Sequence, residues 1–217
     1  TGGPAALCAS AVFMELPPST KIELLAALPQ ACPLHHEQLR ALLSHVLSLL
    51  QAQARADAPL ELGMAQCLRA WQPLGLDLPD LSNGQPLLAA LLLGLRQAEP
   101  LCGVAAEVLC DAMQVGSFPD TQNALILAGL LRDVLLGAPS CLAEGAAEGC
   151  TLAVARVLGA AVCAAPEVVE SMDAAGGGEG ERLRGLLLSL SSLPDRRCLE
   201  ELAPAWAALS HLTAAPG

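Results

Sequence analysis

The sequence predicts an all-α protein, an α-α superhelix built from stacked antiparallel helix pairs. Alanine and leucine dominate a chain that is 53% hydrophobic, whereas tyrosine is absent and phenylalanine and tryptophan occur twice each. Alanine and leucine favour helices, and strands favour β-branched and aromatic residues. Apolar side chains recur at the helical spacing in several segments. Prolines and glycines divide these segments into short helices, which stacking must bury because each pair has too little surface for its own core.

The first predicted elements are two short helices and a longer amphipathic one. Residues 5–16 form a short apolar helix that Pro17 and Pro18 close, because proline has no backbone donor to continue it. A second short helix is expected within residues 19–33. Residues 36–54 give the clearest amphipathic helix, since their apolar residues share one face at the 3.6-residue spacing. These apolar residues are Leu39, Leu42, Leu43, Val46 and Leu50.

The central part of the chain predicts three further helices, over 60–72, 86–97 and 101–114. The segment 74–85 is predicted to be a loop, because it contains the turn signals Leu-Pro-Asp and Ser-Asn-Gly. The helix over 101–114 has an apolar stripe and, on its other side, a stripe of polar residues spaced at i, i+4 and i+7. One face of this helix is therefore expected to pack and the other to remain accessible.

Two longer helices are predicted next, over 120–136 and 141–164. Asp120 is expected to cap the first of them, and Gly137 is expected to end it in the left-handed conformation. The second lies between Pro139 and Pro166 and contains Gly149 and Gly159. Each of these glycines is expected to weaken the helix by up to about 1 kcal/mol.

A final helix pair is predicted over 181–193 and 195–212. The sequence Ala-Gly-Gly-Gly-Glu-Gly before it predicts a flexible loop near residues 173–181. Asp195 is expected to cap the last helix, and Pro204 is expected to kink it.

The helix pairs begin near residues 36, 86, 120 and 181, an irregular spacing around the roughly 40–47 residues of HEAT repeats. We therefore expect residues 1–217 to form a single HEAT/armadillo-like solenoid segment of about four to five helix pairs. The chain starts without methionine and without a targeting pattern, so the sequence is expected to be a fragment of a longer chain.

Charge and cysteine content exclude several classes of protein. The net charge of −11 disfavours nucleic-acid binding, and it suits either a basic protein partner or simple solubility. Nine cysteines without a Cys-x-x-Cys motif predict buried free thiols in a reducing compartment rather than a disulfide framework. No membrane span is expected, because Arg156 interrupts the apolar segment 150–165, and Arg132 and Asp133 interrupt the segment 123–138.

No motif in the sequence predicts an enzyme, a cofactor or a metal site. His35, His36 and His45 are the clustered histidines, and they lack the spacing of a metal-binding helix. The three glycines at 176–178 lack the lysine and hydroxyl residue of a phosphate-binding loop. A Gly-x-Ser-x-Gly motif is also absent. We therefore expect no catalytic, cofactor-binding or metal-binding residues.

Stripes of carboxylates are the candidate partner-binding residues. If the second helix of each pair lines the concave face, these side chains could meet a basic partner; the alternative is a solvated outer face. The candidates are Glu107, Asp111, Gln114, Glu144, Glu148, Glu200 and Glu201.

Several segments resemble the importin-β (karyopherin-β) family, most closely its transportin-3/importin-13 branch. The first is Cys-Leu-Arg-Ala-Trp at 67–71, followed by the leucine-rich stretches 74–81 and 86–95 and by Ala-Ala-Glu-Val-Leu-Cys-Asp-Ala-Met at 105–113. A second match covers residues 183–206, from a leucine helix through an acidic helix to a tryptophan. The Glu-Leu-Pro-Pro stretch near the start also fits a helix end of that branch.

This resemblance implies a central HEAT-repeat fragment of a nuclear transport receptor. Such a receptor would bind protein cargo, basic or Arg/Ser-rich in this branch, for Ran-dependent passage through nuclear pores. The implied partners are cargo, nucleoporins and, through the full-length protein, the GTPase Ran, with shuttling between cytoplasm and nucleus. The alternative is a HEAT or armadillo scaffold that mediates protein–protein interactions unrelated to transport.

Overall fold

The computed structural model describes residues 3–83, 86–115, 121–144, 146–147, 149–174 and 177–214, and this part of the chain is all-α. The helices in chain order are α1 Pro4–Cys8, α2 Ala11–Glu15, α3 Pro18–Ala31, η1 Pro33–His35, α4 His36–Gln51, α5 Leu62–Trp71, η2 Gln72–Leu74, α6 Leu78–Ser82, α7 Pro86–Gly94, α8 Leu101–Val115, α9 Thr121–Leu142, α10 Cys150–Ala164, α11 Pro166–Ala174, α12 Glu179–Ser191 and α13 Arg196–Ala214. No strand occurs among these residues.

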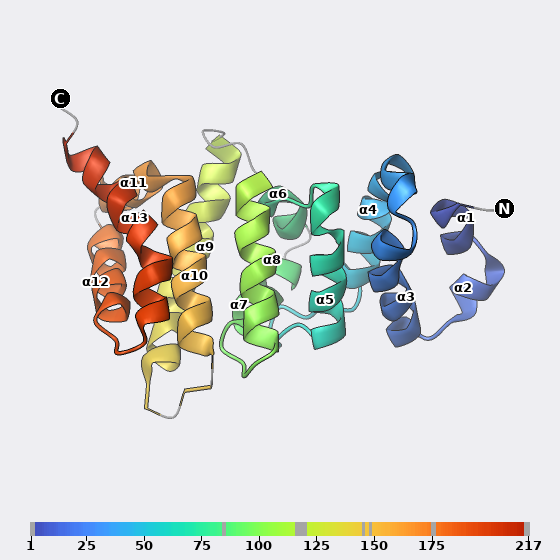
Figure 1. Cartoon of the computed structure of the whole chain (residues 1–217), viewed down its shortest axis with the longest axis horizontal. Helices are drawn as coiled ribbons and strands as arrows, with labels where there is room; N and C mark the ends of the chain where they lie inside the picture. The colour runs from blue at the N-terminus through green and yellow to red at the C-terminus, as the bar shows by residue number, and fades with distance from the viewer. Residues whose placement is uncertain are drawn as a thin grey trace.

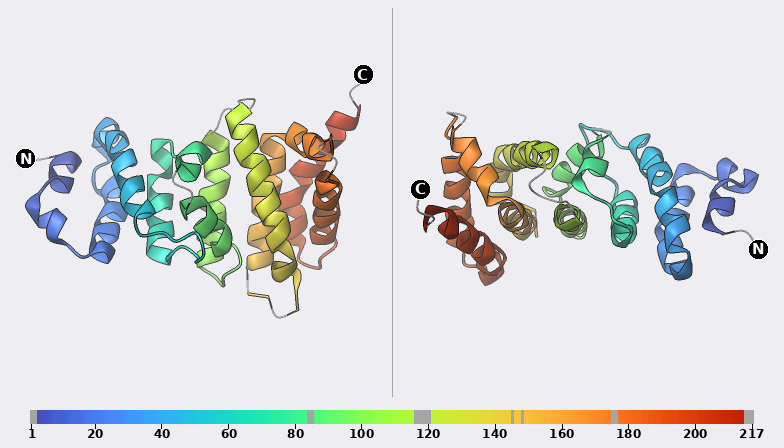
Figure 2. Two further views of the ribbon diagram at one scale, coloured as in Figure 1. Left: turned by 180° about the vertical axis from the view of Figure 1, so that it is seen from behind. Right: turned by 90° about the horizontal axis from the view of Figure 1, so that it is seen from above.

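The helices form two layers along the long axis of the molecule, with the termini at opposite ends (Figure 1). Helices α3, α5, α8, α10 and α13 stand side by side in chain order, and each contacts the next; we call them the front layer. Helices α4, α7, α9 and α12 lie behind them. Seen from above, the two ends of the front layer come forward of its middle, so this layer lies on the inner side of the bend (Figure 2).

A buried tryptophan joins the first two helices of the front layer. Trp71 is fully buried at the end of α5, and its Nε1–H donates a hydrogen bond of 2.8 Å to the backbone carbonyl of Leu25 in α3. That carbonyl lacks its usual helical donor, because Pro29 lies four residues later and has no N–H group. The indole therefore satisfies a backbone acceptor that a proline inside α3 leaves open.

The segment 74–85, predicted to be a loop, contains the short helix α6. The carboxylate of Asp77 accepts the backbone N–H of Asp80 at 2.9 Å, and the carboxylate of Asp80 accepts the backbone N–H of Asp77 at 3.4 Å. This reciprocal pair is a capping box, and Pro79 occupies the first helical turn, where its missing N–H costs nothing. The Leu-Pro-Asp signal therefore marks the start of a helix.

The two long helices predicted over 120–136 and 141–164 have different boundaries in the structure. Helix α9 continues through Gly137 and Pro139 to Leu142, so Gly137 does not end it. Gly149 does not lie inside a helix; it precedes α10 with a φ of 80°, a left-handed conformation that glycine adopts without strain. The predicted cap Asp120 lies outside the described residues.

Smaller differences occur near the termini of the chain. The helix predicted over 5–16 is two helices, because the hydroxyl of Ser10 accepts the N–H of Phe13 at 3.2 Å and starts α2. Helices α11 and α12 extend into the range 173–181 from both sides, so the described part of that predicted loop is short. The predicted cap of α13 is confirmed, since Asp195 accepts the N–H of Arg197 at 3.0 Å.

Two cysteines pair, although the sequence predicted free thiols. Cys141 near the end of α9 and Cys150 at the start of α10 form a disulfide with a Cα–Cα distance of 5.6 Å. The short connection between the helices brings the two residues within the usual range for such a bond. None of the other seven cysteines forms a disulfide.

Helix α9 is long and apolar enough to cross a membrane by length and composition alone. Helices α10 and α11 pass the same test only together, and they are bent by 91° relative to each other. Length and apolar composition are equally typical of a core helix, and Leu127, Leu130 and Leu131 of α9 are buried against the rest of the protein.

Candidate functional site

A groove of about 380 Å³ crosses the front layer between α8, α10 and α13. Its lining combines carboxylates, an arginine, thiols and small residues. The lining residues are Glu107, Cys110, Asp111, Gln114, Arg156, Gly159, Ala160, Cys163, Glu201 and Pro204.

Helix α8 positions one wall of the groove through its two-sided sequence. Val104, Val108 and Ala112 lie on the buried face of this helix. Glu107 and Asp111 lie one helical turn apart on the opposite, exposed face of the helix. The helical period that buries one stripe of α8 therefore presents the other stripe to the groove.

A glycine brings α10 and α13 close together at the other wall. A Cβ atom built on Gly159 would clash with the backbone carbonyl oxygen of Glu201. Because glycine has no Cβ, the backbone of α13 can approach α10 at this point. The close approach places the side chain of Glu201 beside that of Arg156.

Two arginine–glutamate pairs join neighbouring helices of the front layer. Arg69 of α5 binds Glu107 of α8 with an N–O distance of 3.0 Å, and Arg156 of α10 binds Glu201 of α13 at 2.7 Å. All four side chains are 35–47% exposed, so each pair contributes about 1 kcal/mol or less to stability. The pairs neutralise two of the three carboxylates that line the groove.

Asp111 carries the remaining negative charge of the groove. It forms no ion pair with any described residue. Partial burial, and then the neighbouring carboxylate of Glu107, raise the pKa of Asp111 above its usual value. An incoming cation would relieve the repulsion between these two carboxylates.

Two thiols, those of Cys110 and Cys163, line the groove. Burial raises the pKa of Cys110 to about 12, and the nearby carboxylates of Asp111 and Glu201 add to this effect. Burial also raises the pKa of Cys163. The thiol of Cys110 is therefore protonated at neutral pH and is a poor nucleophile. The polarisable side chains of Cys110 and Cys163, together with Ala160, form an apolar part of the groove surface.

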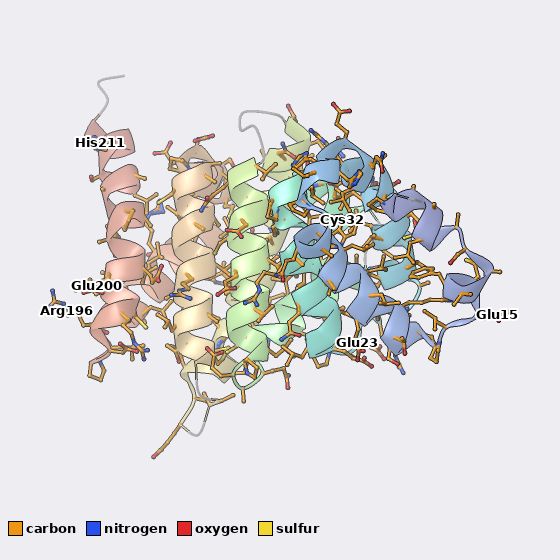
Figure 3. All side chains as sticks on the ribbon, turned by 45° about the vertical axis from the view of Figure 1, so that its right-hand side comes forward. Glu15, Glu23, Cys32, Arg196, Glu200 and His211 are labelled. Atoms are coloured by element: carbon orange, nitrogen blue, oxygen red, sulfur yellow. A yellow bond between two sulfur atoms is a disulfide. The ribbon has the colours of Figure 1, made fainter. Side chains whose placement is uncertain are left out.

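The structure brings together four of the seven residues predicted to bind a partner: Glu107, Asp111, Gln114 and Glu201. Glu144 is exposed after the end of α9 and does not line the groove. Glu200 pairs instead with Arg196 at 3.0 Å, and Figure 3 shows both at the far edge of α13. Glu148 lies outside the described residues.

The sequence reasoning missed the residues that α10 contributes. The sequence marks Arg156 as an interruption of an apolar segment and Gly159 as a destabilising residue in a helix, whereas both line the groove in the structure. The signal available in the sequence was the spacing of Arg156, Gly159, Ala160 and Cys163, which share one face of a helix. That face could not be assigned to a partner helix without the fold.

A second groove, of about 460 Å³, lies in the rear layer between α9 and α12. Leu135, Leu136, Leu142 and Leu186 line it, and an ion pair of 2.7 Å between Arg132 and Glu179 borders it. Among the described residues, no group of three or more histidine, cysteine, aspartate or glutamate side chains could hold a metal ion.

Comparison of the chain with protein-family models, with curated proteins and with solved structures gives no match.

Proposed function

We propose that this chain is a protein-binding segment of a HEAT/armadillo-like α-α superhelix, and that the groove between α8, α10 and α13 engages a basic segment of its partner. The observation that carries the proposal is the gathering of Glu107, Asp111 and Gln114 with Glu201 in one groove. These residues come from helices far apart in the sequence.

The order of helix contacts supports a superhelix. Each front-layer helix contacts mainly the next front-layer helix, and the rear-layer helices connect them. This nearest-neighbour pattern is typical of repeat proteins, which use their inner surface to bind extended partners.

The charges of the groove favour a partner with a single inserted basic side chain. Glu107 and Glu201 already hold arginines, so Asp111 is the carboxylate that can accept an ammonium or guanidinium group. The amide of Gln114 lies on the same helical face one turn away and can accept a further hydrogen bond. The aliphatic stem of the inserted residue would rest on the thiols and Ala160.

The D111K variant is expected to bind a fluorescein-labelled Arg/Ser-repeat peptide about ten-fold more weakly than the wild type, because it places a cation where the cation of the peptide binds. Fluorescence anisotropy at fixed ionic strength measures the affinity. The matched control is E144K, which changes the net charge equally outside the groove and should bind within about two-fold of wild type. Equal loss in both variants would mean that net charge, and not the groove, attracts the peptide.

The pH dependence gives a further readout of the same groove. The carboxylate form of Asp111 binds the cation, so wild-type binding should weaken as the pH falls through the raised pKa of Asp111. The D111N variant has no proton to take up at this position. D111N should therefore bind the peptide more weakly than wild type, and its affinity should not fall further as the pH drops through the pKa of Asp111.

The resemblance to the importin-β family supports a more specific form of the proposal, a nuclear transport receptor whose groove binds Arg/Ser-rich cargo. The similar segments include residues 67–71 at the end of α5 and residues 105–113 within α8. Full-length protein should then bind Ran loaded with a non-hydrolysable GTP analogue in a pull-down, and Ran should change its affinity for cargo. Peptide binding that ignores Ran would favour the scaffold alternative, and it would leave the groove proposal intact.

A further inference from the structure

Lys21 carries the only side-chain amine in these 217 residues, and it joins two helices at the N-terminal end of the molecule. Its Nζ donates a hydrogen bond of 2.8 Å to the backbone carbonyl of Met14. The same ammonium lies 6.0 Å from the centre of the Phe13 ring. Both contacted residues belong to α2, whereas Lys21 belongs to α3.

Both contacts depend on the positive charge of Lys21. Met14 is the next-to-last residue of α2, and the last carbonyls of a helix have no helical donor. A cation at this end also interacts favourably with the helix dipole. The face of the Phe13 ring attracts a cation as well. Loss of the charge would therefore weaken both contacts at once.

Helix α2 buries few side chains against the rest of the protein. It is five residues long and lies at the outer end of the molecule (Figure 1), and Glu15 at its last position stands at the outer edge in Figure 3. Phe13 is its one buried side chain, whereas Val12 is 73% exposed and Met14 61% exposed. The buried ring and the ammonium of Lys21 thus keep α2 against the rest of the protein.

We propose that Lys21 is a modification site, a charge-dependent latch whose acylation releases α2 and uncovers the apolar end of the helix stack. The neutral amine attacks the carbonyl carbon of a thioester acyl donor. The N–C bond forms, the C–S bond breaks, and the amine proton leaves with the thiol. The product amide is uncharged, so it loses the cation–π contact and the charge-assisted hydrogen bond to Met14.

Hydrogen–deuterium exchange of the backbone amides of residues 13–16 tests the latch. In K21Q these amides should exchange about ten-fold faster than in wild type, because a charge-assisted contact at the end of α2 is lost. In K21R, which keeps the charge, they should exchange within about two-fold of wild type. Exchange in α8 and α10 should be unchanged in both variants and serves as the internal control for folding.

Acetylation of the 217-residue polypeptide with an N-hydroxysuccinimide ester tests the modification itself, because Lys21 is the one lysine among these residues. Treated wild type should show the faster exchange of K21Q, and treated K21R, which has no lysine at this position, should not. Three results would overturn the proposal: a Lys21 that stays unmodified while the N-terminus reacts, unchanged exchange in K21Q, or equal loosening in K21Q and K21R.

Discussion

Replacing Trp71 with phenylalanine should lower the free energy of unfolding by about 2 kcal/mol, although an aromatic ring still fills the site. The variant removes the donor to the Leu25 carbonyl, which Pro29 deprives of its helical partner. A buried acceptor without a donor costs about 1–3 kcal/mol, and the smaller ring leaves a cavity. The W71A variant loses the whole fully buried side chain and should lose about 3–5 kcal/mol. Urea unfolding followed by circular dichroism measures these changes.

A double-mutant cycle separates the hydrogen bond from the packing. P29A restores a backbone N–H that can bond the Leu25 carbonyl, so W71F should cost at least about 1 kcal/mol less in the P29A background than alone. If the two substitutions are additive within about 0.5 kcal/mol, the indole stabilises the protein through packing only. The carbonyl of Leu25 would then have another partner in the folded state.

G159A should lower the free energy of unfolding by about 1–3 kcal/mol, although alanine is the better helix former. The new methyl group would meet the backbone carbonyl of Glu201, and backbone cannot move aside as a flexible side chain can. Helices α10 and α13 must therefore separate, which also weakens the pair between Arg156 and Glu201. Thermal and urea unfolding measure the loss.

G129A is the matched control for this prediction. Gly129 also lies inside a helix, α9, but a Cβ atom built there has no other atom within 4 Å. The substitution should therefore raise the free energy of unfolding by about 0.5–1 kcal/mol through helix propensity alone. If both alanine variants were more stable than wild type, the inference that the backbone of α13 leaves no room for a methyl group at Gly159 would be wrong.

Local features of the sequence predicted the helices well where one local signal dominates. The apolar stripe of 36–54 predicted α4, and the two stripes of 101–114 predicted α8. The polar stripe of α8 also supplied three of the groove residues, because residues at i, i+4 and i+7 share a face in any helix. Asp195 was identified as a cap because it precedes an apolar period.

Local signals failed where two readings of the same residues compete. The Leu-Pro-Asp signal predicts a turn at Pro79, yet this residue lies in the first turn of α6, because Asp77 and Asp80 cap each other. The sequence predicts a helix end at Gly137 and a helix interior at Gly149. In the structure Gly137 lies inside α9, and Gly149 precedes the start of α10. A glycine tolerates both situations, so its sequence position does not choose between them.

The sequence by itself determined that the described part of the chain is all-α, most of its helices and which faces of them are polar, because composition and the helical period act over a few neighbouring residues. Only the tertiary structure decided which polar faces meet. Glu107 and Arg69 are 38 residues apart, Arg156 and Glu201 are 45 apart, and Trp71 and Leu25 are 46 apart. These contacts depend on how the helices stack. The helical period defines the face of each helix, but it does not specify which other helix packs against that face.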